Sequence, residues 1–192
     1  MKEIIFATHN QHKLEEVQTI LKKEYNVIGL NSLNFDEEIE ETGTTLEKNA
    51  QLKAETIFNK FQINCFADDS GLEIEALNGE PGIFSARYAG EPADSQKNMQ
   101  KVLDKMQNIS NRKAKFRTVI AYKTKEKILF FEGSVEGQIL TEKRGNGGFG
   151  YDPIFMPKGY DKSFAELSSE EKNRISHRAI AIKKFINYIK TL

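Results

Sequence analysis

Residues 64–76 read NCFADDSGLEIEA, and this stretch decides how the rest of the chain is interpreted. Residues 64–67 predict a short apolar strand, and the alternation of apolar residues with glutamates after Gly71 predicts a half-exposed one. Asp68 and Asp69 stand between the two runs, where adjacent carboxylates repel each other unless a cation or a proton relieves them. Because Gly71 permits a sharp backbone path, we expect the two acids at the edge of a sheet, in a metal-binding or catalytic role. The alternative is an Asx-turn with surface carboxylates.

The hydrophobic pattern on both sides of this stretch predicts alternating strands and helices. Apolar residues at helical spacing indicate helices over 13–23, 46–61 and 95–107, and short β-branched or aromatic runs indicate strands over 3–7, 26–30 and 135–140. The runs 115–122 and 127–131 flank a polar turn, which is typical of a hairpin. Ser168 and Glu171 have the spacing of a capping box, and we expect the helix after them to continue to the C-terminus. The pattern predicts an α/β fold of mixed α+β type, with a mixed sheet flanked by helices in one continuous domain over residues 1–192.

Composition excludes several classes of protein. The chain has 192 residues, 28 Lys and Arg against 28 Asp and Glu, and a formal net charge of zero, which argues against a protein that coats nucleic acid. A single cysteine, Cys65, excludes a disulfide framework and any zinc site built from paired cysteines. The chain contains no apolar run of about 18 residues, so no membrane span is expected, and the apolar start Ile4–Ala7 is too short for a signal peptide. We therefore expect a soluble, cytoplasmic protein.

The turn between the first strand and the first helix is a candidate phosphate site. A strand-to-helix turn gathers free backbone N–H groups and the positive end of a helix dipole, which suits an anion. Thr8 and Asn10 can add hydrogen bonds there, and Lys13 can add a positive charge. The alternative is an ordinary N-cap turn with a surface lysine.

An acidic cluster lies upstream of the second predicted helix. If this stretch is extended, Glu38 and Glu40 point to the same face, and two carboxylates on one face are a plausible pair of Mg²⁺ ligands. The alternative is a solvated acidic loop. The cluster comprises Asp36, Glu37, Glu38, Glu40 and Glu41.

Residues 145–152 contain a literal G-x-G-x-x-G, but they do not indicate a dinucleotide-binding fold. That fingerprint must follow a strand and open a helix, whereas Pro153 and the two apolar residues after it suit an extended segment. A glycine-rich loop that carries Phe149, Tyr151 and Asp152 could stack on a nucleobase and bind its edge. The alternative is a loop whose aromatic side chains belong to the core.

The charged segment 171–178 is the last candidate. Lys172 and Ser176 are four residues apart, so they share a helix face, and Arg178 lies roughly opposite Lys172 if the helix stays regular. Basic residues near a helix start oppose its dipole, which is unusual unless an anion lies nearby; a solvated charged face is the alternative. The chain has neither the P-loop pattern of nucleotide hydrolases nor the nucleophile elbow of esterases.

Five motifs, in this order, resemble those of the inosine/xanthosine triphosphate pyrophosphatases. The resemblance extends from the first predicted strand to the last predicted helix. The motifs are IFATHNQHK at 5–13, ADDSGL at 67–72, PGIFSARYAG at 81–90, GGFGYDPIF at 147–155 and EKNRISHRA at 171–179.

This resemblance implies an enzyme that hydrolyses ITP, dITP and XTP to the monophosphate and pyrophosphate, and so keeps these purines out of DNA and RNA. It also implies an elongated, twisted mixed sheet in two lobes, a central cleft that holds the site, a homodimer, and Mg²⁺ as cofactor. Asp69 is then the catalytic proton acceptor and a metal ligand, together with Glu38 or Glu40. The residues implied to bind substrate are Thr8, His9, Asn10, Gln11, His12, Lys13, Lys53, Ser70, Phe149, Gly150, Tyr151, Asp152, Lys172, His177 and Arg178.

The expected reaction is attack of water on the α-phosphorus, with the charge of the leaving pyrophosphate neutralised by Lys13, Lys53 and Lys172. A pocket that donates hydrogen bonds to the purine six-carbonyl would reject adenine. Three other hypotheses stand beside this one. An aspartic-type hydrolase would need a second copy of the Asp69-Ser70-Gly71 pattern or a symmetric dimer. A nucleotide-binding protein without turnover would bind and not hydrolyse, and an RNA-binding protein would show a continuous basic face.

Overall fold

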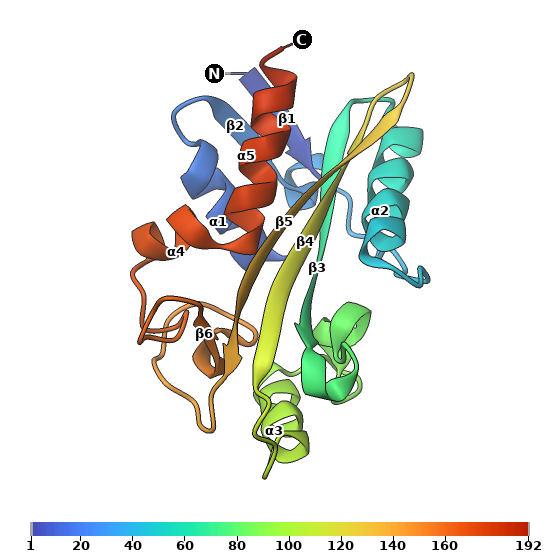
Figure 1. Ribbon diagram of the computed structural model, residues 1–192. Helices are drawn as coiled ribbons and strands as arrows, with labels where there is room; N and C mark the ends of the chain where they lie inside the picture. The colour runs from blue at the N-terminus through green and yellow to red at the C-terminus, as the bar shows by residue number, and fades with distance from the viewer. Residues whose placement is uncertain (1, 192) are drawn as a thin grey trace. The chain divides into compact units, whose positions relative to one another are not determined.

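The computed structural model describes residues 2–191, so the ends of the predicted domain, Met1 and Leu192, lie outside it. Within the described residues the six strands form one mixed sheet in the order β2-β1-β3-β4-β5-β6 (Figure 1). β1 pairs in parallel with β2 and β3, whereas β5 and β6 are antiparallel, which confirms the predicted mixed fold. The strands are β1 Lys2–Phe6, β2 Tyr25–Ile28, β3 Cys65–Ile74, β4 Lys113–Lys123, β5 Ile128–Ile139 and β6 Phe155–Pro157.

Side-chain caps fix where most of the helices begin. Asn10, Thr45, Asp94 and Ser168 each accept a backbone N–H of the following turn, which satisfies donors that an α-helix leaves free. Ser168 and Glu171 form the predicted capping box. The α-helices are α1 Gln11–Leu21, α2 Leu46–Phe61, α3 Ser95–Lys105, α4 Ser169–Ile175 and α5 His177–Ile189.

The chain divides into two compact units. Unit 1 comprises Met1–Asp69, Thr118–Gly133 and Arg178–Leu192. Unit 2 comprises Ser70–Arg117 and Ser134–His177. The unit boundary thus falls directly after the acid pair of the decisive stretch.

Unit 1 has a hydrophobic cluster on each face of its strands, because strand residues point alternately to opposite faces. On β1, Phe6 belongs to a cluster with α1 and α5, whereas Ile5 belongs to a cluster with α2. β3 follows the same rule: Phe66 lies on the α1 and α5 face, and Cys65 and Ala67 lie on the α2 face. Figure 1 shows α5 and α2 on opposite sides of these strands. The alternation therefore assigns Asp68 to the α1 and α5 face and Asp69 to the α2 face.

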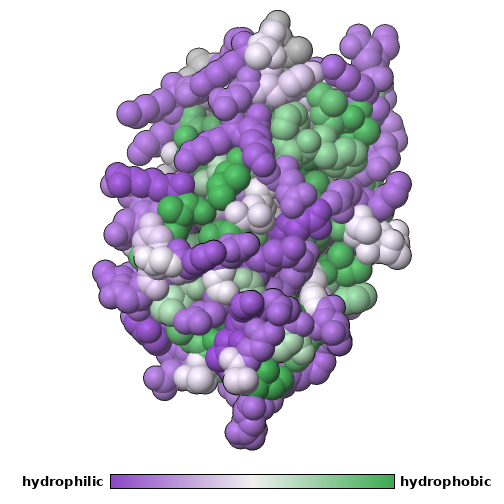
Figure 2. All heavy atoms as spheres, viewed as in Figure 1, coloured by the Kyte–Doolittle hydropathy of each residue, from purple (hydrophilic) through white to green (hydrophobic). Residues whose placement is uncertain are grey.

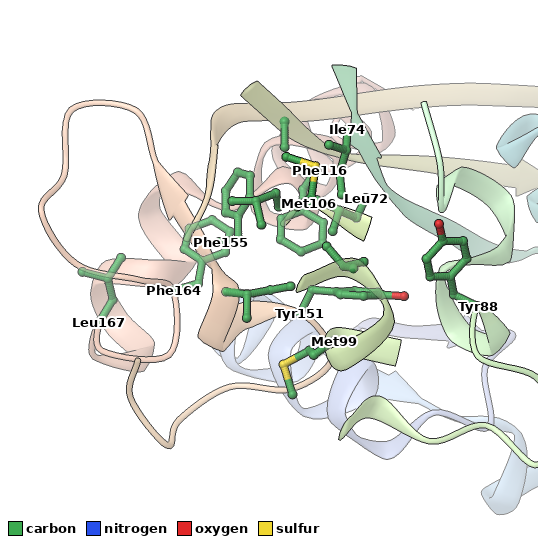
Figure 3. Packing of buried hydrophobic residues seen from close by; sticks show 14 residues of the cluster. Leu72, Ile74, Tyr88, Met99, Met106, Phe116, Tyr151, Phe155, Phe164 and Leu167 are labelled. Carbon is green, nitrogen blue, oxygen red and sulfur yellow. The ribbon is translucent and has the colours of Figure 1, made fainter. Parts of the chain in front are cut away.

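Unit 2 is built around an aromatic cluster. Phe116 of β4 packs edge-on against Phe155 of β6, with ring centroids 4.6 Å apart, and Phe164 and Tyr151 belong to the same cluster. Figure 3 shows these rings together with Met99 of α3. This cluster holds the glycine-rich loop that precedes β6.

The surface view in Figure 2 is mainly hydrophilic, and hydrophobic side chains show on it in separate small areas. This agrees with a chain in which 29% of the residues are charged. No helix within residues 2–191 combines the length and the apolar character needed to cross a membrane.

The decisive stretch differs from its prediction. It forms one continuous strand, β3, instead of two strands with a turn between them. Gly71 does not make a turn; a Cβ at this position would lie 2.5 Å from the Gly82 carbonyl oxygen, so glycine serves a close approach of two backbones. The acid pair lies within the strand, where each carboxylate meets cations on its own face. In the same way, β5 joins the predicted strands 127–131 and 135–140 into one.

The predicted C-terminal helix is also interrupted. Ser176 has extended backbone, with φ −65° and ψ 151°, and its N–H closes α4 on the Lys172 carbonyl at 2.8 Å. α5 then begins at His177. The expectation that Lys172 and Arg178 lie on one regular helix is therefore wrong: Lys172 belongs to α4 in unit 2, and Arg178 belongs to α5 in unit 1.

Candidate functional site

The predicted phosphate turn is the N-cap of α1. Asn10 Oδ1 accepts the Lys13 N–H at 3.1 Å, and Thr8 Oγ1 accepts the Asn10 N–H at 3.1 Å. The first turn of α1 contains no acidic residue that would offset the positive end of the helix dipole. His9 pairs Nε2 with the Glu37 carbonyl at 3.0 Å, while Gln11 and His12 are exposed.

Asp68 is held between two cations on the α1 and α5 face. Lys13 Nζ donates to its Oδ1 at 2.9 Å, and Arg178 Nε donates to its Oδ2 at 3.1 Å. Arg178 also donates to Glu16 of α1. The Asp68 and Arg178 side chains are only 2% exposed, so this is a buried ion-pair network.

Burial alone would raise the pKa of Asp68, but Lys13 and Arg178 outweigh it and hold that pKa well below its ordinary value. The pKa of Arg178 is raised, because Glu16 and Asp68 outweigh the loss of solvation. Burial lowers the pKa of Lys13, which the charge of Asp68 only partly offsets. Asp68 is therefore ionised at neutral pH, and its charge is balanced by Lys13 and Arg178.

Asp69, on the opposite face, has weaker partners. Asn49 Nδ2 of α2 donates to its Oδ2 at 3.1 Å, and Lys53 Nζ lies 3.7 Å from its Oδ1. Burial raises the pKa of Asp69, and the charges of Lys53 and Lys13 offset this only in part. Asp69 is thus the more basic carboxylate of the pair and the one suited to accept a proton.

Lys53 bridges Asp69 to the acidic segment. Its Nζ lies 2.6 Å from Glu41 Oε1, and although burial opposes its charge, Asp69 and Glu41 raise the pKa of its ammonium group. Glu38 and Glu40 are exposed, whereas the Glu41 side chain is 22% exposed. The acidic segment has no regular strand, so the period-two rule that selected Glu38 and Glu40 does not apply to it.

Asn49 connects the acidic segment to Asp69 a second time. Its Oδ1 accepts the Gly43 N–H at 2.8 Å, while its Nδ2 donates to Asp69. The side chain is fully buried at 0% exposure, so both bonds are shielded from water.

Glu41 and Asp69 have the donor chemistry of divalent-cation ligands, and both lie beside Lys53. Lys53 already places a positive charge beside both carboxylates, and their oxygens are the hard donors that Mg²⁺ prefers. Within residues 2–191 no three His, Cys, Asp or Glu side chains form a metal-holding group. Two carboxylates would suffice, since Mg²⁺ usually keeps several waters and is completed by substrate phosphates.

Unit 2 contains the predicted base-binding residues. Asp152 Oδ2 accepts from Lys172 Nζ at 2.7 Å and from the Phe149 N–H at 2.8 Å. The Lys172 ammonium lies 4.8 Å from the centroid of the Phe149 ring. Gly148 has φ +69°, and a Cβ there would lie 2.1 Å from Asp152 Oδ2, so the loop is tightly fixed around this carboxylate.

The remaining predicted residues of unit 2 differ in exposure. Tyr151 is 5% exposed and belongs to the aromatic core, which matches the alternative interpretation for this ring. His177 is buried, with its ring stacked on Phe116 at 4.7 Å. Phe149 and Ser70 are half-buried.

The structure thus brings together Lys13, Lys53, Asp69 and Arg178 in unit 1, and Phe149, Asp152 and Lys172 in unit 2. Sequence reasoning missed Glu16, and it did not single out Glu41 or Asn49. Asn49 had a usable signal, because it is a polar residue on the apolar face of α2 beside Ala50. Glu16 had none, since its partner Arg178 is 162 positions away.

Comparison with known proteins places the chain among relatives that match it over nearly its whole length. The chain is 51% identical to the dITP/XTP pyrophosphatase of Bacillus subtilis over 188 residues, which is 96% of this chain and 95% of the relative. It is 48% identical to the dITP/XTP pyrophosphatase of Porphyromonas gingivalis over 190 residues, 98% of each.

Two solved structures are similar to this chain in both fold and sequence. The Staphylococcus aureus Ham1 protein has a TM-score of 0.89 and 44% identity over 99% of both chains. A HAM1 protein from Coxiella burnetii has a TM-score of 0.90 and 40% identity over 100% of both chains. The family model described as Ham1 family matches residues 4–188. With this match and these identities, the chain belongs to the Ham1 family.

Proposed function

We propose that the protein hydrolyses the purine nucleoside triphosphates dITP, ITP and XTP to the monophosphate and pyrophosphate. The observation that carries this proposal is the environment of Asp69, a buried and relatively basic carboxylate beside Lys53 and Glu41. Full-length similarity to proteins named dITP/XTP pyrophosphatase supports the same activity. Removal of these nucleotides would keep deaminated purines out of DNA and RNA.

In the proposed reaction, Asp69 accepts a proton from the attacking water. The water oxygen forms a bond to the α-phosphorus, the bond from the α-phosphorus to the bridging oxygen breaks, and pyrophosphate leaves with that oxygen. Lys13 and Lys53 supply positive charge for the phosphates, because both ammonium groups are held at Asp68 and Asp69. The N-terminus of α1 adds backbone N–H groups to the same task.

Mg²⁺ would be held by Asp69 and by a carboxylate of the acidic segment, and when bound it would neutralise charge on phosphate oxygens. Glu41 is the best candidate of that segment, since Lys53 already joins it to Asp69. Glu38 and Glu40, the ligands expected from sequence, are exposed.

Phe149 and Lys172 of unit 2 are the proposed base-binding residues. The Phe149 ring can stack on the base, and the Lys172 ammonium group above that ring can donate a hydrogen bond to a purine carbonyl. Such a donor would favour a six-carbonyl over the six-amine of adenine. The other predicted substrate contacts, at His9, Gln11, His12, Ser70, Gly150, His177 and Arg178, stay predictions, as do the homodimer and the cytoplasmic location.

One assay tests the proposed function. Purified protein is incubated with Mg²⁺ and dITP, XTP, dGTP or dATP, and the phosphate product is identified. We expect pyrophosphate from dITP and XTP, with far slower release from dGTP and dATP. Orthophosphate as the first product would mean that another bond is cut, and binding without any product would indicate a nucleotide-binding protein.

A further inference from the structure

The segment Pro81–Gly90 is one of the five quoted motifs, and no role in the reaction has been assigned to it. It contains a 3-10 helix, Gly82–Arg87, and lies in unit 2, separated from the end of β3 by a short 3-10 turn, Glu75–Leu77. Its polar groups connect it to three other elements of that unit, as the following bonds show.

Ser85 attaches the segment to β3. Its Oγ accepts the Leu72 N–H at 2.9 Å and donates to the Gly82 carbonyl at 2.6 Å. The Gly82 carbonyl is the group that lies too close to Gly71 for any Cβ. The segment therefore rests on β3 beside Ser70, a predicted substrate contact.

Ser85 also attaches the segment to the glycine-rich loop 145–152, which is called the base-binding loop below. Its carbonyl oxygen accepts the Tyr151 hydroxyl at 2.7 Å, and both residues are buried. Figure 3 shows the Tyr151 ring within the aromatic cluster, with its hydroxyl directed toward the segment that carries Tyr88. Tyr151 lies between Phe149 and Asp152, so this bond joins the base-binding loop to β3 through Ser85.

Asn98 of α3 fixes the far end of the segment. Its Nδ2 donates to the Ala86 carbonyl at 2.8 Å, and its Oδ1 accepts the Ala89 N–H at 2.6 Å. Asn98 is 3% exposed, so the segment is held by buried bonds on both sides.

The Tyr151 hydroxyl mainly fixes the position of the base-binding loop and adds little to the free energy of unfolding. Phenylalanine would fill the same volume in the cluster and would leave no polar group to desolvate, and the net gain from one such hydrogen bond is small. Discrimination between bases, in contrast, depends on the placement of ring and donor groups to a fraction of an ångström.

We propose that Ser85 and Tyr151 are positioning residues for purine discrimination: through their hydrogen bond, the segment Pro81–Gly90 holds the base-binding loop in register with β3. This inference rests on the proposed function. Neither side chain needs to touch the nucleotide, because the bond acts by fixing Phe149 and Asp152, which flank Tyr151.

The test is the ratio of kcat/KM for dITP to kcat/KM for dGTP in Tyr151→Phe. This ratio does not depend on the fraction of folded enzyme, so a purely structural loss leaves it unchanged. We expect it to fall about fivefold, the loss equivalent to one hydrogen bond, through a higher KM for dITP at nearly constant kcat. A ratio equal to that of the wild type would overturn the inference.

Tyr88→Phe is the matched control. Tyr88 is also buried, but its hydroxyl bonds the Glu80 side chain at 2.6 Å instead of a group linked to the base-binding loop. We expect the wild-type ratio in this variant. An equal fall in Tyr88→Phe and Tyr151→Phe would overturn the specific role of the Tyr151 bond.

Ser85→Ala removes both Oγ bonds and should lower the same ratio. Because the two residues act through one connection, the double variant should lose less than the product of the two single losses. Fully multiplicative losses would contradict a shared connection. If Ser85→Ala does not fold, the Tyr151 variant decides by itself.

A wild-type enzyme without preference for dITP would overturn the proposed function and this inference together, whereas a preference that Tyr151→Phe retains would overturn the inference alone.

Discussion

Asp68 and Asp69 are adjacent in the chain, yet they face opposite sides of β3 and meet different partners. The α1 and α5 face gives Asp68 two direct cation contacts, from Lys13 and Arg178. The α2 face gives Asp69 an amide from Asn49 and a lysine at 3.7 Å. The pKa of the first carboxyl is therefore lowered and that of the second raised, although both are buried.

This difference shows how one strand can supply both a structural anion and a reactive base. Burial acts on both carboxylates in the same direction, so the distribution of cations decides the outcome. Asp68 stabilises the junction of α1 with α5, and Asp69 is left basic enough to accept a proton. The following predictions test this division, beginning with the largest expected effect.

Asp69→Asn should reduce pyrophosphate release by about a thousandfold or more, because it removes the proposed proton acceptor and a metal ligand while keeping the shape of the side chain. Its thermal unfolding should change less than that of Asp68→Asn, since Lys53 keeps Glu41 as an anion at 2.6 Å. A near-normal rate in this variant would remove Asp69 from the mechanism.

Asp68→Asn should destabilise the protein by about 3–5 kcal/mol, because the buried Arg178 and Lys13 lose their common anion. Urea unfolding at pH 7 measures this difference, with Asp69→Asn as the matched control on the other face. Equal stability of the two variants would contradict the division.

The stability difference between Asp68→Asn and the wild type should shrink as the pH falls. A carboxyl with a lowered folded-state pKa stabilises the fold above its unfolded pKa of about 3.9, and this contribution is lost as the pH falls toward the folded-state value. The sign is opposite for Asp69. Because its folded-state pKa is raised, the ionised carboxylate lowers the stability of the fold at neutral pH, and protonation at lower pH removes this cost. Urea unfolding at pH 7 and at about pH 3, below the unfolded pKa, should show the stability difference between Asp68→Asn and the wild type decreasing; a constant difference would contradict this reasoning.

Glu41→Gln should raise the Mg²⁺ concentration needed for half-maximal activity about tenfold, because it removes the carboxylate that Lys53 joins to Asp69. Glu38→Gln and Glu40→Gln are matched controls of the same segment, and they should change this concentration less than twofold. A larger effect at Glu38 or Glu40 would return the metal site to the residues expected from sequence.

The parts of the molecule set by local pattern were predictable. α2 begins and ends where the hydrophobic spacing predicted, and Ser168 and Glu171 cap α4 as expected. The acid pair was also recognisable, since adjacent buried carboxylates need a cation.

Tertiary contacts decided what the pattern left open. The break at Ser176 has no glycine or proline to mark it, so helical spacing alone continued across it. Glu41 could not be chosen over Glu38 and Glu40, because an irregular segment has no fixed face. The bond from Tyr151 to Ser85 joins positions 66 apart, and no local signal announces it.

The most direct test of the division is a pH titration of the two carboxyl carbons by NMR in protein with ¹³C-labelled aspartate, assigned with Asp68→Asn and Asp69→Asn. We expect the Asp69 resonance to titrate above the ordinary aspartate range, and the Asp68 resonance to stay that of an ionised carboxylate to the lowest pH at which the protein is folded. Two carboxyls that titrate together near pH 4, or Asp68 protonating before Asp69, would contradict the assignment of structural anion and reactive base.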